Sequence, residues 1–103
     1  MTDLAARVRA LLDVPTVEKR MFGGISFMAD DAMLLSVRGS GDLLVRVDPA
    51  RSEELRADHG ATLTTMGNRS MGPGWLTVPA GRLGTAEQLQ FWLDVALEFN
   101  GQR

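Results

Sequence analysis

The segment of this chain that best suits contact with a ligand is Met66-Gly67-Asn68-Arg69-Ser70-Met71-Gly72-Pro73-Gly74. Glycine-rich backbone can turn successive N–H groups toward an anion, and the guanidinium of Arg69 can bind that anion through two hydrogen bonds. The segment is not a P-loop, because it lacks the Gly-Lys-Ser/Thr ending and a following helix. The plainer interpretation, which we favour, is a loop between two strands in which Arg69 satisfies nearby carbonyls or a carboxylate.

Side chains that could build a catalytic or metal centre are few. The chain has no cysteine, which excludes disulfides and thiolate metal ligands. Its single histidine, His59, lies near the end of a predicted helix, where a cation is favoured by the helix dipole, so we interpret it as a surface or capping residue. Asp30-Asp31 is typical of a turn, in which aspartate side chains bond to their own backbone. Because the serines occur in no nucleophile motif, we expect no catalytic residues, no metal and no cofactor.

Apolar periodicity and turn residues divide the chain into helices and short strands. Helical spacing and capping residues predict helices over about 2–13, 49–58 and 85–99. Short apolar runs between turn residues predict strands over about 16–22, 25–29, 32–37, 43–47, 61–66 and 75–78. Connections this short favour antiparallel neighbours. We therefore predict one domain over residues 1–103, of the α+β class: two layers, an antiparallel sheet with flanking helices, in the order α-β4-α-β2-α.

Alternation along the strands predicts which residues share a face of the sheet. Gly23-Gly24 is expected to form the tight turn between the first two strands, because glycine readily takes positive φ. The face beneath the helices is predicted to hold Ile25, Phe27, Met33, Leu35, Val37, Leu43, Val45 and Val47. The opposite face is predicted to hold the apolar residues Phe22, Met28, Leu34 and Leu44 beside Arg20, Ser26, Ser36 and Arg46. Because this second face is too apolar for a solvated sheet, we expect a partner subunit or part of the chain itself to cover it.

The composition limits the classes of function. With 103 residues, 45% hydrophobic and 23% charged, the chain is typical of a soluble globular domain. No signal peptide or membrane-length apolar run is present, so the cytoplasm is the default location. The net charge of −2 argues against broad nucleic-acid binding, which needs a basic surface, although a local basic patch is compatible with it.

Four motifs in register are similar to a known family. Arg20-Met21-Phe22-Gly23-Gly24 before Ile25-Ser26-Phe27-Met28 resembles the N-terminal domain of the TfoX/Sxy family. The other three motifs, in the same order, are Leu44-Val45-Arg46-Val47-Asp48, the Met66–Met71 loop with Gly74-Trp75, and the closing helix with Trp92. The resemblance implies an antiparallel sheet flanked by helices, like the type III secretion chaperone fold. It also implies kinship with bacterial regulators of natural competence, two-domain proteins thought to act with the cyclic-AMP receptor protein. This chain resembles their first domain alone, and the resemblance supplies no catalytic residues.

Two classes of function follow from these observations. The leading hypothesis is a non-enzymatic regulatory or protein-interaction module, acting as a homodimer or with a protein partner through Phe22, Met28, Leu34 and Leu44. The alternative is a small-molecule or anion-binding domain, or an enzyme without a recognisable motif, centred on Arg20, Arg46, Arg69 and the glycine-rich loop. Direct contact with DNA is a third and weaker hypothesis.

Overall fold

The computed structural model describes residues 4–12, 15–21, 24–29, 32–38, 41–66, 69–70 and 72–101. Its helices are α1 (Leu4–Leu11), α2 (Ser52–His59) and α3 (Ala86–Gly101), with short 3-10 turns η1 (Pro49–Arg51) and η2 (Ala80–Arg82). Its strands are β1 (Val17–Met21), β2 (Gly24–Ala29), β3 (Ala32–Arg38), β4 (Leu43–Arg46), β5 (Thr62–Leu63), β6 (Thr65–Met66), β7 (Arg69–Ser70) and β8 (Trp75–Val78). No helix within these ranges is both long and apolar enough to cross a membrane.

Six of the strands form one antiparallel sheet in the order β1-β2-β3-β4-β8-β5. The α+β class and the antiparallel arrangement are confirmed. The predicted strand over 61–66 is instead two strands, β5 and β6, separated at Thr64. The predicted loop also contains β7, which pairs with β6 through Thr65–Ser70 and Met66–Arg69. The glycine-rich composition of this segment predicts a loop and gives no indication of β7.

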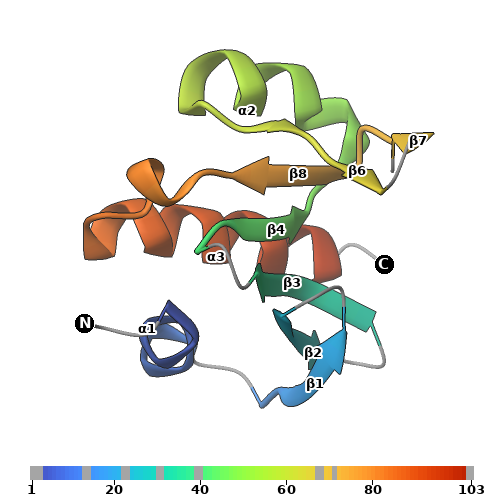
Figure 1. The fold of residues 1–103 in the computed structure, drawn as a ribbon. Coiled ribbons are helices and arrows are strands. Elements are labelled where there is room, and N and C mark those ends of the chain that lie inside the picture. The colour runs from blue at the N-terminus through green and yellow to red at the C-terminus, as the bar shows by residue number, and fades with distance from the viewer. Residues whose placement is uncertain are drawn as a thin grey trace.

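The last helix packs over the middle of the sheet, and the other two helices flank it. α3 lies across β3 and β4, with α1 and α2 toward opposite edges (Figure 1). His59 of α2 stacks on Phe91 of α3, and Arg7 of α1 donates a hydrogen bond to the Thr85 carbonyl oxygen. The core between these layers includes Val8, Phe27, Leu35, Val45, Leu55, Leu76, Leu89 and Leu93, which are fully buried. Burial of this apolar area is the main term that stabilises the fold.

An irregularity in β3 corrects the predicted faces of two residues. Phe27 pairs with Leu35 and Met28 pairs with Met33, so Leu34 is an extra residue on β3. A bulge of this kind interrupts the alternation of side chains. Leu34 therefore joins the core cluster, whereas Met33, although buried, is outside it. The prediction had assigned these two residues the other way round.

The hairpin of β1 and β2 also differs from its prediction. Arg20 pairs with Ile25, and cross-strand partners share a face, so Arg20 lies on the face of Ile25 rather than on that of Ser26. Gly24 belongs to β2 and pairs with Met21, and it is not among the described glycines with positive φ. A Cβ on Gly24 would overlap the Val37 carbonyl oxygen and lie 2.8 Å from the Arg38 Cα. Close approach of β3, not turn geometry, therefore requires glycine at this position.

The centre of the sheet face that carries Ser26 is covered by the chain itself. Ser26, Ser36 and Leu44 lie side by side across β2, β3 and β4, and each is 0% exposed in the single chain. The Ser26 hydroxyl donates to Ser36 Oγ at 3.1 Å, and Ser36 donates to the Ile25 carbonyl oxygen at 3.3 Å. Because these hydroxyl groups have partners, their burial costs little. The sequence predicts that either a partner subunit or the chain itself covers this face. The chain alone buries Leu44, so a partner subunit is not needed there.

Candidate functional site

Arg46 is the predicted site residue around which the structure builds a pocket. It ends β4 directly opposite Trp75 of β8. Its guanidinium carbon lies 5.7 Å from the centre of the Trp75 ring and 5.2 Å from the centre of the Phe99 ring, near the end of α3. Both distances are within the range at which a cation is attracted to the face of an aromatic ring. Two rings from different elements therefore hold one half-buried positive charge.

The glycine-rich segment supplies the next wall of this pocket. The Val47 N–H donates to the Gly74 carbonyl oxygen at 2.8 Å, which continues the β4–β8 pairing past Arg46. The Trp75 N–H donates to the Gly72 carbonyl oxygen at 3.3 Å and closes a turn, in which Gly72 has a φ of 91°. Glycine takes this conformation without the strain that a side chain would add. The resulting pocket of about 250 Å³ is lined by Arg46, Val47, Pro49, Gly72, Pro73, Gly74, Trp75 and Phe99.

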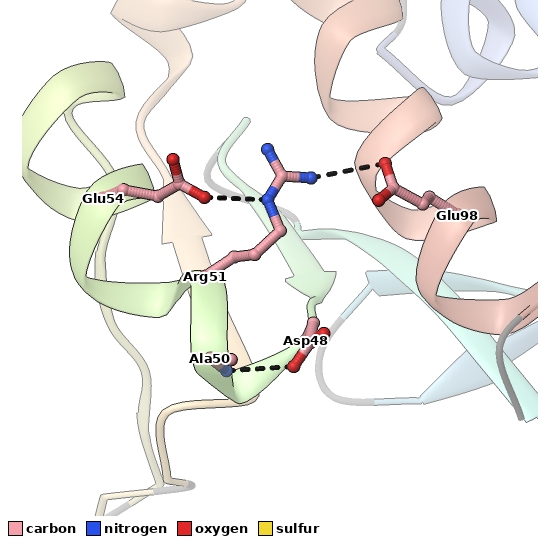
Figure 2. Close-up of polar contacts among 5 residues, drawn as sticks. All are labelled: Asp48, Ala50, Arg51, Glu54 and Glu98. Carbon is pink, nitrogen blue, oxygen red and sulfur yellow. Dashed lines mark hydrogen bonds and ion pairs between the residues drawn. The ribbon is translucent and has the colours of Figure 1, made fainter.

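A group of polar contacts fixes the opposite walls. Figure 2 shows Arg51 between Glu54 and Glu98, at 2.9 Å from the Glu54 carboxylate and 3.4 Å from that of Glu98. The second contact ties the start of α2 to the turn of α3 that carries Phe99. Asp48 accepts a hydrogen bond from the Ala50 N–H at 2.9 Å, so it caps η1 and orients Pro49 (Figure 2).

The chemistry available in the pocket is recognition of an anion. The Arg46 side chain forms no ion pair or hydrogen bond with any residue that the structure describes. A guanidinium remains charged at all physiological pH values and carries five N–H donors in one plane. Attraction to the two rings involves no N–H···O hydrogen bond, so those donors remain available to a carboxylate or a phosphate in the pocket. Among the described residues, no three histidine, aspartate or glutamate side chains gather closely enough to hold a metal ion.

The three predicted arginines do not all come together. Arg20 is exposed on β1, and two strands, β2 and β3, separate it from β4. The backbone of Arg69 lies in β7, but its side chain is outside what the structure describes. Arg46 and the Gly72–Gly74 end of the loop are therefore the predicted elements that the described structure brings together.

The residues of the predicted interaction face differ in their exposure. Leu44 is 0% and Leu34 is 1% exposed, so both are enclosed by the chain. Met28 is half-buried, and Phe22 lies outside the described residues. Whether this face takes part in assembly stays a prediction.

Sequence reasoning did not identify Trp75, Phe99 and Pro49 as walls of a site. Phe99 lies within the helix predicted over about 85–99, where aromatic residues are ordinarily core. The available signal was an aromatic residue directly after Gly72-Pro73-Gly74. The two glycines carry no side chains, so space for a ligand is left beside the aromatic ring.

Comparison with known proteins agrees with the motifs in the sequence. No curated protein sequence matches the chain. The model of the TfoX N-terminal domain matches residues 10–100, which include α2, all of α3 except its last residue, and every described strand of both sheets. Since that match covers most of the 103 residues, the chain belongs to the TfoX N-terminal domain family.

Proposed function

We propose that this domain is a non-enzymatic binding module that recognises an acidic segment of a partner protein through Arg46. The observation that carries this proposal is a guanidinium held over two aromatic rings without a carboxylate partner in the described chain. By contrast, Arg9 is paired with Glu18, and Arg51 is paired with Glu54 and Glu98. An unpaired but positioned arginine is typical of a recognition group.

The surroundings of Arg46 favour a peptide over a buried small molecule. The pocket is bounded by the exposed Pro73 and Pro49, and its rings are half-buried. A side-chain carboxylate that enters such a shallow site leaves its own backbone outside, where further contacts can form. This arrangement agrees with the regulatory role that the family resemblance implies, since regulators act through partners. A second copy of the chain is one such partner, and light scattering during size-exclusion chromatography measures whether it forms.

A free small anion is the second candidate ligand. The proximity of Arg46 to the Gly72–Gly74 turn favours it, because a glycine-rich turn admits a ligand close to the backbone. Phosphate and acetate are suitable probes for it.

The test is an NMR titration of the ¹⁵N-labelled domain with a hexaglutamate peptide, and separately with phosphate and acetate. If the domain recognises an acidic segment, the peptide should cause saturable chemical-shift changes at residues 46–49, 72–75 and 99. The affinity should fall as the salt concentration rises. Arg46→Gln is expected to weaken binding about tenfold, as for loss of a charge-assisted hydrogen bond. The matched control is Arg38→Gln on β3, which changes the net charge equally and does not line the pocket.

The outcomes separate the candidates. Binding of the peptide that Arg46→Gln weakens and Arg38→Gln does not supports the proposal. Equal affinity for phosphate or acetate would replace it with the small-anion function. Equal losses of affinity in Arg46→Gln and Arg38→Gln would indicate nonspecific charge attraction and overturn both candidates. The absence of saturable shifts with every probe would also overturn both.

A further inference from the structure

A second cavity, of about 270 Å³, lies beside the first turns of α3, whereas the Arg46 pocket lies near its last turns. It is lined by His59, Arg82, Glu87, Gln88, Phe91 and Trp92. These residues come from the end of α2, from η2 and from α3. A concave site that combines aromatic walls with a few polar groups is the usual form of a small-molecule site.

The apolar wall of this cavity is a fixed set of three rings. His59 and Phe91 stack with their ring centres 4.2 Å apart and their planes at 27°. Trp92 meets Phe91 edge to face, with centres 5.2 Å apart and planes at 86°. Trp92 is only 2% exposed, whereas Phe91 is half-buried and offers the accessible surface. The rings therefore present a rigid apolar surface to a ligand rather than one that must form on binding.

The polar rim carries one positive and one negative charge. Neither the Arg82 side chain nor the Glu87 side chain has an ion pair or hydrogen bond within the described chain, and both residues are exposed. Gly60, at a φ of 74°, makes room for the arginine, because a Cβ there would lie 2.6 Å from Arg82 Nε. Two opposite charges thus border the same cavity without neutralising each other.

Gln88 adds an oriented donor. The side-chain oxygen of Gln88 accepts a hydrogen bond from the Thr85 backbone N–H at 3.1 Å. The backbone N–H of Gln88 in turn donates to Thr85 Oγ1 at 3.1 Å. This capping box fixes the amide and leaves its NH₂ group without an acceptor in the described residues. The rim therefore offers donors from Arg82 and Gln88 and an acceptor from Glu87.

We propose that this cavity binds a free α-amino acid with an aromatic or large aliphatic side chain. Arg82 and Gln88 bind its carboxylate, Glu87 binds its ammonium group, and its side chain packs on Phe91. A simple anion would meet repulsion from Glu87, and a simple cation would meet it from Arg82, so the pair of charges selects a zwitterion. The volume suits a ligand of about a dozen non-hydrogen atoms, the size of phenylalanine. The inference is independent of the function proposed for Arg46.

The experiment is an NMR titration of the ¹⁵N-labelled domain with three probes that differ in charge. L-phenylalanine carries both charges, 3-phenylpropionate lacks the ammonium group, and phenethylamine lacks the carboxylate. The proposal predicts saturable shifts at residues 59–60 and 82–92, with phenylalanine bound with a Kd on the order of 1 mM or tighter and about tenfold more tightly than either analogue. Arg82→Gln and Glu87→Gln are each expected to lower its affinity about tenfold, because each removes one charge-assisted contact.

Charge-matched controls are Arg38→Gln and Glu53→Gln, which line neither cavity. Circular dichroism establishes that every variant is folded, as expected for substitutions at the exposed Arg82 and Glu87. The proposal is overturned if phenylalanine produces no saturable shifts, if either analogue binds as tightly, or if the controls lose as much affinity as the rim variants. Because Arg46 is not involved, Arg46→Gln should bind phenylalanine as the unaltered domain does.

Discussion

Arg9 and Glu18 join α1 to β1 through two parallel hydrogen bonds. Arg9 Nε and one terminal nitrogen each lie 2.8 Å from a different oxygen of the Glu18 carboxylate. Hydrogen bonding from Arg9 lowers the pKa of Glu18 below its ordinary value of 4.5, and the charge of Arg9 lowers it further, whereas partial desolvation opposes both. The pair thereby favours the ionised carboxylate in the folded state.

Glu18→Gln is expected to lower the free energy of unfolding by less than about 1 kcal/mol at neutral pH, as for an exposed ion pair. Because the folded pKa lies below the unfolded one, the stabilisation is full above pH 4.5 and is lost as the pH falls through the folded pKa. Urea unfolding at several pH values measures the difference, with Glu53→Gln as the control. A difference that persists unchanged under strongly acidic conditions would contradict this account.

Gly24→Ala is expected to destabilise the domain by about 1–3 kcal/mol, because the added methyl group forces β2 away from β3. Gly81→Ala is the matched control, since a Cβ at Gly81 has nothing within 4 Å and its φ is not positive. That control should be neutral or slightly stabilising. Equal midpoints of urea unfolding for the two variants would show that the close approach to Val37 is not a constraint.

Asp48→Ala is expected to cost about 1 kcal/mol, because it removes the acceptor that caps η1. Asp48→Asn retains a side-chain oxygen and should recover most of that loss. Thermal unfolding of the three proteins compares them. If the asparagine variant were as unstable as the alanine variant, the charge of Asp48 rather than its hydrogen bond would be responsible.

Leu44→Ala is expected to cost about 2–5 kcal/mol, the range for truncating a fully buried leucine. Leu63→Ala, at a side chain that is 42% exposed, should cost much less. Urea unfolding measures both, and dilution tests whether the result depends on assembly. A cost at Leu44 that disappears when the protein is diluted would mean that a second copy, not the chain itself, supplies its cover.

Most of the secondary structure could be predicted from local patterns. Helical spacing located α3, and the turn residues located the strands from β1 to β4, because these signals act over a few residues. The bulge at Leu34 could not be predicted, since Met33, Leu34 and Leu35 are all apolar and any of the three suits the core. The face of Arg20 was predicted wrongly because alternation was continued through a turn, whereas pairing with Ile25 determines it.

The candidate site was predictable only in part. The loop and Arg46 were identified by residue type, because glycine and arginine have distinctive chemistry. The rings of Trp75 and Phe99 were not, because only the register of β4 with β8 and the position of α3 bring them to Arg46. Pairings between distant segments leave no periodic signal in the sequence.

The sheet order has a consequence for how the domain folds. β1 to β4 pair with their neighbours in sequence, but β8 must return to β4 after α2 and three other strands have intervened. Pairing between distant segments requires a costly loop closure and is generally slow. Since Arg46 and Trp75 face each other across that pairing, the site at Arg46 is complete only after β8 has paired with β4. A ligand that bridges them would slow unfolding, so the rate of unfolding would itself report occupancy.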